Sequence, residues 1–189
     1  MPTKGTSRMI GAIIQARVNS TRLHNKALLD ICGKPMLVRV IDRTKMAVEN
    51  ITVATPNEEI IEIALDEGVQ AFQGDEYDVL DRYYHTANII GLNDIIRITS
   101  DCPLIEPGVI DYAIQFFLTH PYPYITIAPI DGMDVEVFSM EMLEIARDEA
   151  LSKEDREHVT PFMKRYTKMS IDTIEDYNKV RKMWTGKVK

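Results

Sequence analysis

Three cationic side chains lie close together in the segment Gln15–Leu28, which reads QARVNSTRLHNKAL. They are Arg17, Arg22 and Lys26, and small or hydrogen-bonding residues such as Ser20 separate them. A guanidinium group can bind two phosphate oxygens at once, a lysine supplies a point charge, and loop N–H groups fill the remaining positions. The segment therefore predicts a polyphosphate-binding loop, although a solvated basic loop is the simpler alternative. It is not a Walker loop, because the glycines and the lysine-serine or lysine-threonine ending are missing.

Two aspartates could supply ligands for a metal ion. Asp101 follows an apolar run and precedes Cys102 and Pro103. An aspartate at the end of a central strand suits Mg²⁺, which prefers one or two carboxylates together with phosphate oxygens and water. Asp172 lies far along the chain. Each aspartate could instead cap the helix expected after it, a frequent role of this residue type, so the residues alone leave both interpretations open.

Other polar residues allow both a functional and an ordinary interpretation. Gly74 precedes Asp78 and Arg82, which are spaced like a surface ion pair on a helix. Arg156 could bind a carboxylate or a phosphate, whereas His158 could assist deprotonation or simply form a hydrogen bond. A lone histidine is more often structural, so these residues need further support.

Hydrophobic patterning predicts the elements that would position these residues. Runs rich in Ile and Val without alternation predict buried parallel strands at Met9–Gln15, Ile51–Ala54, Val69–Phe72, Asp94–Ile98 and Tyr124–Ala128. Helical periods between them predict helices at Pro35–Ala47, Glu58–Glu67, Val79–Ile90 and Pro107–Leu118. Alternation of strand and helix predicts βαβ units in an α/β fold, with a mostly parallel sheet covered on both faces.

The pattern changes after Pro129. Asp134–Ser139 alternates acidic and apolar residues, which predicts an added strand with one polar face. The elements expected after it are helices at Met140–Ala150 and Ser152–Tyr166, a strand at Met169–Asp172 and a helix at Ile174–Trp184. Ligands of doubly wound sheets bind at the carboxyl ends of the strands, so the chemistry is expected in the loops there.

The basic loop resembles the A-R-x-x-S-T-R-L-P-x-K-x-L signature of the sugar-acid cytidylyltransferases, which include CMP-sialate and CMP-KDO synthetases. The resemblance is strongest to the spore-coat polysaccharide biosynthesis protein F family. The matching residues are Ala16, Arg17, Ser20, Thr21, Arg22, Leu23, Lys26 and Leu28. His24 and Asn25 replace the usual Pro-Gly, and an asparagine can adopt the left-handed conformation that glycine favours.

Five further segments are similar to motifs of the same family. They are residues 72–83 (FQGDEYDVLDRY), 97–105 (RITSDCPLI), 131–138 (DGMDVEVF) and 155–161 (DREHVTP), and residues 171–177 resemble its D-T-P-E-D segment. The resemblance implies one nucleotidyltransferase domain over residues 1–189. It further implies a three-layer α/β/α fold with a mostly parallel, Rossmann-like sheet of the nucleotide-diphospho-sugar transferase type.

The resemblance also implies a role for each candidate residue. Asp101 and Asp172 would hold Mg²⁺, and Arg17, Arg22 and Lys26 would be catalytic. The nucleotide would be bound by Gln15, Ala16, Arg17, Ser20, Arg22, Lys26, Gly74, Asp78 and Arg82, and the acceptor by Asp134, Glu136, Arg156 and His158. Arg17 and Arg22 would contact the β- and γ-phosphates, and Lys26 would meet the charge that grows on the α-phosphate.

The implied reaction transfers CMP from CTP to an acidic sugar and releases pyrophosphate, in the synthesis of a surface polysaccharide. CTP and the sugar acid come from the resemblance alone. The alternatives are a metal-dependent glycosyltransferase, whose usual D-x-D pair is here Ser100-Asp101-Cys102, and a non-catalytic nucleotide-binding relative. The resemblance leaves a homodimer open.

Composition excludes several other classes of protein. The chain has 189 residues, 45 % of them hydrophobic, which is enough for one core. A formal net charge of −7 argues against sequence-independent binding of nucleic acid. The apolar run Met9–Ile14 is too short to span a membrane, and Cys32 and Cys102 have no C-x-x-C partner, so a cytoplasmic protein is expected.

Overall fold

The computed structural model describes residues 8–19 and 23–168, together with residues 178 and 181. The strands are β1 (Ile10–Gln15), β2 (Ile51–Thr55), β3 (Gln70–Gln73), β4 (Asp94–Thr99), β5 (Tyr124–Ile127) and β6 (Val135–Ser139). The helices are the 3₁₀ turn η1 (Lys26–Leu28), α1 (Met36–Lys45), α2 (Glu58–Asp66), α3 (Val79–Ile90), α4 (Pro107–Thr119), α5 (Met140–Glu149), α6 (Lys153–His158) and α7 (Pro161–Tyr166). The strand expected at 169–172 lies outside the described residues, and so does the helix expected at 174–184 apart from residues 178 and 181.

The six strands form one sheet in the order β3-β2-β1-β4-β6-β5. β1 pairs in parallel with β2 and β4, and β2 pairs in parallel with β3. β6 runs antiparallel to both β4 and β5. The predicted α/β architecture with a mostly parallel sheet is therefore confirmed.

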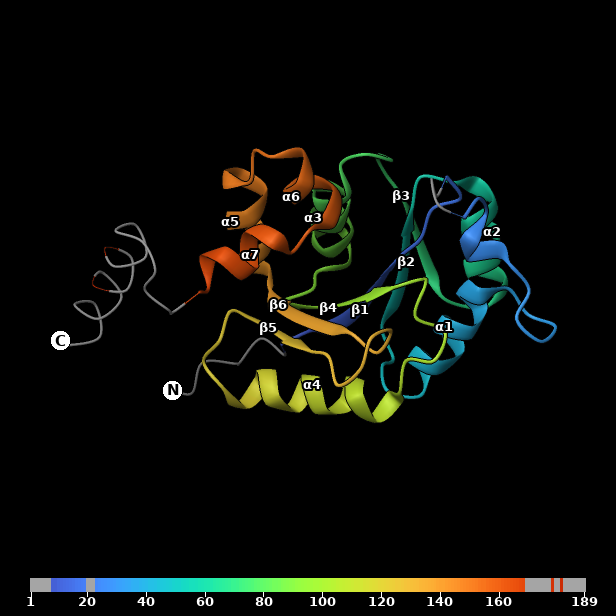
Figure 1. Cartoon of the computed structure of the whole chain (residues 1–189), viewed down its shortest axis with the longest axis horizontal. Coiled ribbons are helices and arrows are strands. Elements are labelled where there is room, and N and C mark those ends of the chain that lie inside the picture. Colours follow the sequence, from blue (N-terminus) through green and yellow to red (C-terminus); the bar gives the residue numbers. More distant parts are fainter. Residues whose placement is uncertain (1–7, 20–22, 169–177, 179–180, 182–189) are drawn as a thin grey trace, which may run out of the picture.

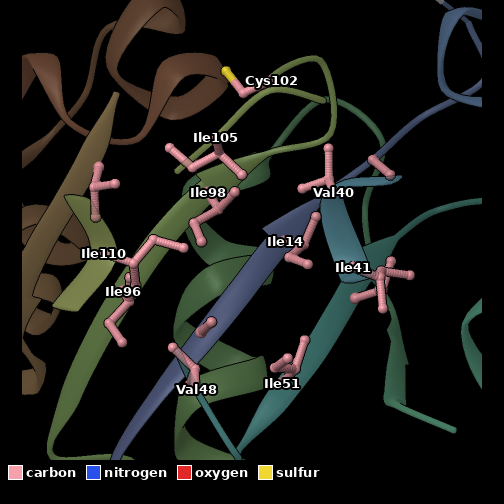
Figure 2. Close-up of a cluster of buried hydrophobic side chains, with 14 of the residues drawn as sticks. Ile14, Val40, Ile41, Val48, Ile51, Ile96, Ile98, Cys102, Ile105 and Ile110 are labelled. Carbon is pink, nitrogen blue, oxygen red and sulfur yellow. The ribbon is translucent and has the colours of Figure 1, made fainter. Parts of the chain in front are cut away.

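Helices cover both faces of the sheet, since successive residues of a strand point to opposite sides. Ile14 packs in one buried cluster with residues of α1, α2 and α4, whereas Ile13 packs in a second with residues of α3, α5 and α7. Figure 1 shows α4 on one side of the sheet and α3, α5 and α6 on the other. Figure 2 shows Ile14 in the first cluster, between side chains of α1 and β4. This double burial explains why β1, β2 and β4 are apolar runs.

Two expectations about the strands after α4 are wrong. Tyr124–Ala128 was expected among the buried parallel strands; β5 runs in the direction of β4, but it lies at the sheet edge, pairs antiparallel with β6 and exposes Thr126. The short connection at 128–134 explains this, because a parallel return needs a longer crossover. The second strand, β6, was expected to have one polar face, yet Glu136 is only 3 % exposed and four consecutive residues of β6 are buried.

The single helix expected at Ser152–Tyr166 is two helices. α6 ends at His158, and the buried Val159 after it has a φ of 69°, which breaks the helical path. Pro161 has no N–H to continue a helix and instead begins α7, a position where proline is tolerated. In the described ranges no helix has the length and apolar character needed to cross a bilayer.

Candidate functional site

A cleft of about 700 Å³ opens where β1 and β4 reach their carboxyl ends. Several separate parts of the chain line it. The lining residues are Gln15, Ala16, Arg17, Leu23, Lys26, Ala27, Val79, Arg82, Arg97, Thr99, Ser100, Asp101, Cys102, Asp131, Gly132, Asp134, Glu157 and His158. This is the edge of a parallel sheet where ligands of doubly wound folds bind.

Arg17 enters the cleft directly after β1. Its Nη2 donates a hydrogen bond of 2.9 Å to Glu157 Oε1 at the end of α6, and both side chains are about one-third exposed. This hydrogen bond, assisted by the charge of Arg17, lowers the pKa of Glu157. Arg17 therefore lies in a partly exposed ion pair, in which an incoming anion can replace Glu157.

Lys26 is the first residue of η1 and faces Asp101, which follows β4. The loop turns into η1 at Asn25, whose φ of 55° and ψ of 27° are left-handed, so the conformation expected for this asparagine is confirmed. Lys26 Nζ donates to Asp101 Oδ2 at 2.8 Å. The loop after β1 and the loop after β4 thus bring opposite charges together at the cleft floor.

Asp101 is ionised and accessible from the cleft. Burial opposes its charge, but hydrogen bonds from Lys26 and the Thr99 hydroxyl outweigh that effect and lower the pKa of Asp101. Its side chain is 45 % exposed. One carboxylate in this position fits Mg²⁺, which completes its coordination with phosphate and water oxygens.

Of the two aspartates expected to bind such an ion, the described structure includes Asp101. Within residues 8–19 and 23–168, three or more His, Cys, Asp or Glu side chains nowhere gather closely enough to hold a metal by themselves. Asp172, the second expected ligand, lies outside the described residues. The described residues therefore fit a cation whose ligands are mostly phosphate oxygens.

Arg82 on α3 is only 2 % exposed, although it lines the cleft. Its Nη1 donates to the carbonyl oxygen of Asp75, and its Nε has no hydrogen-bond partner among the described residues. The pKa of Arg82 is lowered mainly by burial, and the charge of Arg17 acts in the same direction. Arg82 therefore places a largely buried positive charge at the wall of the cleft.

Gly74 supports Arg82 from behind and does not line the cleft. A Cβ at Gly74 would come within 2.8 Å of Arg82 Cγ and 3.1 Å of a ring carbon of Phe72. The absence of a side chain at this glycine therefore makes room for the arginine.

Two expected ligand-binding residues pair with each other outside the cleft. Asp78, a nucleotide-site candidate, caps α3 by accepting from Asp81 N at 3.0 Å and also accepts from Arg156. Arg156, an acceptor-site candidate, donates as well to the carbonyl oxygen of Arg147. Neither lines the cleft, so both act as supports between α3 and α6.

Glu136 also lies behind the cleft wall rather than in it. Its carboxylate accepts from Arg97, from Tyr124 Oη at 2.7 Å, from Thr160 Oγ1 at 2.9 Å and from Lys164 Nζ at 3.1 Å. Its oxygens are thus occupied by protein donors, unlike the acceptor contact expected from the sequence.

The remaining candidates divide cleanly by position. Gln15, Ala16, Arg17, Lys26, Arg82, Asp101, Asp134 and His158 line the cleft, whereas Ser20 and Arg22 lie outside the described residues. Arg97, Thr99, Ser100, Cys102, Asp131 and Glu157 were missed as cleft residues. Their neighbours in the 97–105, 131–138 and 155–161 segments were the available signal.

Cations from the loop after β1, from η1 and from α3 thus line the same cleft as an ionised aspartate at the carboxyl edge of a parallel sheet. That combination defines a binding site for nucleotide phosphates. A sequence model of one family, described as cytidylyltransferase, matches residues 11–183. The chain belongs to this cytidylyltransferase family, a family of nucleotidyltransferases.

Three relatives illustrate the breadth of this similarity. An uncharacterized protein of Methanocaldococcus jannaschii is 34 % identical over 90 % of this chain and 80 % of its own length. The spore coat polysaccharide biosynthesis protein SpsF of Bacillus subtilis is 29 % identical over 91 % of this chain and 85 % of its own length. The 3-deoxy-manno-octulosonate cytidylyltransferase of Geobacter sulfurreducens is 40 % identical over 59 % of this chain and 46 % of its own length.

Solved structures share the fold over nearly the whole chain. A cytidylyltransferase from Leptospira borgpetersenii has a TM-score of 0.80 and 28 % identity, covering 97 % of this chain and 89 % of its own. A CMP:2-keto-3-deoxy-manno-octonic acid synthetase complexed with CTP has a TM-score of 0.70 and 19 % identity, covering 96 % of this chain and all of its own. The second likeness concerns the fold alone.

Proposed function

We propose that the protein transfers a cytidylyl group from CTP to a hydroxyl of an acidic sugar, in the synthesis of a surface polysaccharide. The observation that carries this proposal is the cleft in which Lys26 meets Asp101 at 2.8 Å and which Arg17 and Arg82 also line. Family membership supports the reaction class. The names of the Bacillus and Geobacter relatives support a polysaccharide role and a sugar-acid acceptor.

Binding of the triphosphate would exchange the two ion pairs of the cleft for pairs with the ligand. Arg17 would leave Glu157 for the β- and γ-phosphates, with Arg22 beside it, and Lys26 would leave Asp101 for the α-phosphate. Charge-assisted hydrogen bonds from a guanidinium to phosphate are stronger than exposed ion pairs, so the exchange is favourable. Arg82, which also lines the cleft, would lie beside the nucleoside.

The chemical step is an in-line displacement at the α-phosphorus. The acceptor hydroxyl oxygen forms the new P–O bond, the bond to the β-phosphate oxygen breaks, and pyrophosphate leaves with the electron pair. The hydroxyl proton passes to a base, for which His158 in the cleft is the candidate. Mg²⁺, held by Asp101 and Asp172, would neutralise phosphate charge when bound. Positioning and electrostatics supply most of the catalysis in such reactions.

A pyrophosphate-release screen tests this function. Each of the four nucleoside triphosphates is combined with 3-deoxy-manno-octulosonate, nonulosonates and neutral sugars, with and without EDTA. We expect release only with CTP, an acidic sugar and Mg²⁺. Release of UDP or GDP from sugar nucleotides would instead identify a glycosyltransferase, and tight CTP binding without turnover would identify a non-catalytic relative.

A further inference from the structure

Arg97 is a cleft residue to which the sequence assigned no function. It lies on β4, and the sheet register places it opposite Ile13 of β1 and opposite Glu136 of β6. Directly opposed residues of antiparallel strands point to the same face, so Arg97 and Glu136 form a cross-strand pair. Arg97 also donates from Nε to Gln15 Oε1 at 3.2 Å. Its guanidinium is thus held from both neighbouring strands.

The network around Arg97 fixes its direction while leaving positive charge in the cleft. Glu136 is shared with Lys164, so one carboxylate serves two cations. Tyr124 and Thr160 complete the hydrogen bonds of Glu136. The hydrogen bonds to Gln15 and Glu136 use Nε and one Nη of Arg97, and the Tyr83 hydroxyl takes a third, whereas a guanidinium carries five N–H groups. Some N–H groups of Arg97 therefore remain available to a ligand in the cleft.

Stability alone is a poor explanation for this arrangement. The side chains of Arg97 and Glu136 are 14 % and 5 % exposed, and burying an ion pair costs desolvation that packed apolar residues avoid. A buried pair whose cation lines a cleft is instead explained by a ligand that needs the cation. A planar guanidinium group can bind a carboxylate with two parallel hydrogen bonds.

The position of Arg97 in the sheet indicates which part of the substrate it meets. Under the proposed function, Arg17 and Lys26 are engaged by phosphates, and Arg82 lies on α3, the helix that follows β3. Arg97 lies on β4, the neighbour of β6, and lines the cleft together with Asp134. Arg156, the residue expected from the sequence to bind an acidic group, is engaged with Asp78 outside the cleft.

We propose that Arg97 binds the carboxylate of the acceptor and so selects acidic sugars, with Glu136 and Gln15 as its positioning residues. This inference rests on the proposed function, because it concerns the acceptor of that same reaction. Glu136 acts indirectly, because it orients the guanidinium group of Arg97. Arg97 makes the contact itself.

Calorimetry with paired ligands tests the role of Arg97. The probes are 3-deoxy-manno-octulosonate and a nonulosonate, each with its carboxamide, added to protein that holds Mg²⁺ and a non-hydrolysable CTP analogue. For the acid that wild-type protein binds best, Arg97→Gln should weaken binding about 10- to 100-fold, as expected for loss of a charge-assisted hydrogen bond. Binding of the carboxamide and of the CTP analogue should change by less than about threefold.

Three further variants separate recognition from folding. Arg147→Gln is the control for loss of a paired arginine, because Arg147 forms a more exposed ion pair with Asp81 outside the cleft. The double variant Arg97→Gln/Glu136→Gln removes both buried charges together and should fold while showing the same loss of acid binding. Arg97→Lys should restore part of the preference for acid over carboxamide.

Four outcomes would overturn the inference. They are equal binding of acid and carboxamide by wild-type protein, equal weakening of both by Arg97→Gln, a loss of CTP-analogue affinity as large as that for the acid, and a loss of acid preference in Arg156→Gln rather than in Arg97→Gln. Pyrophosphate release is measured in parallel. If Arg97 proves not to bind the acid but the wild-type protein turns over, the inference is rejected and the proposed function stands. Selective acid binding without turnover would support the inference and reject the reaction.

Discussion

Replacing Lys26 with alanine tests whether the cation at the cleft floor serves catalysis rather than folding. Its ion pair with Asp101 is 2.8 Å long, but the two side chains are 37 % and 45 % exposed. Pairs with that exposure contribute about 0–1 kcal/mol to stability, because water and salt screen them. Lys26→Ala should therefore leave the free energy of unfolding almost unchanged.

The expected effect on turnover is much larger. A preorganised donor that meets developing charge contributes about 10²–10³ in kcat, and a lysine at the α-phosphate is such a donor. The assay is steady-state pyrophosphate release with CTP and the acceptor found in the screen, alongside urea unfolding of the same samples. We expect kcat to fall by about that factor while CTP binding falls less.

Lys34→Ala provides a matched control. Lys34 pairs with Asp42 at 2.7 Å, with side chains 44 % and 35 % exposed, but lies outside the cleft lining. Loss of either lysine should change stability alike, and only loss of Lys26 should reduce turnover. If kcat of Lys26→Ala stays within about tenfold of that of Lys34→Ala, the assignment of Lys26 to the α-phosphate is refuted.

The same variant has a consequence for pH dependence. In the wild-type protein partial burial opposes the charge of Asp101, and Lys26 and Thr99 outweigh it, so the pKa of Asp101 is below its ordinary value. A depressed carboxyl pKa stabilises the protein above the unfolded pKa, and this contribution is lost as pH falls through the folded pKa. Removing Lys26 leaves the burial effect. The acid limb of the kcat/KM profile should then move to higher pH.

Three further variants test the supports of the cleft. Gly74→Ala should displace Arg82, weakening CTP binding about tenfold in calorimetry while changing the free energy of unfolding by only about 1 kcal/mol. Glu136→Gln should lower stability in urea unfolding by about 3–5 kcal/mol at neutral pH, since it leaves a buried cation unpaired. Burial opposes the charge of Glu136, but its cationic partners outweigh this effect and lower its pKa. Wild-type stability should therefore fall as pH drops below about 4.3. This loss of stability in acid should be smaller in Glu136→Gln. Glu157→Gln should release Arg17 and strengthen CTP binding about two- to fivefold at low salt, an effect that salt should reduce.

Each of these expectations has a result that contradicts it. Unchanged CTP affinity in Gly74→Ala would show that Arg82 does not meet the nucleoside. A stability of Glu136→Gln equal to wild type at neutral pH would reject the buried network as described. Weaker CTP binding in Glu157→Gln at every salt concentration would indicate that Glu157 helps the nucleotide instead of competing with it.

The local pattern of the sequence determined most of the elements and the family. Ile-rich unalternating runs predicted β1, β2 and β4, because strands covered on both faces need apolar side chains at every position. The spacing of Arg17 and Lys26 after the first strand predicted a basic loop at the correct edge of the sheet. These features are local in the chain, so they can be read without knowing which distant segments meet.

Only the tertiary structure decided which polar residues face the ligand. Arg156 and Asp78 are distant in sequence and satisfy each other across α3 and α6, which removes both from the cleft. The register of β4 and β6 buries Glu136 against Arg97, and that pairing depends on β6 running antiparallel. Hydrophobic periodicity in the sequence indicates which residues are buried. Whether a polar side chain binds a ligand or another residue of the protein depends on the long-range pairing of strands and helices.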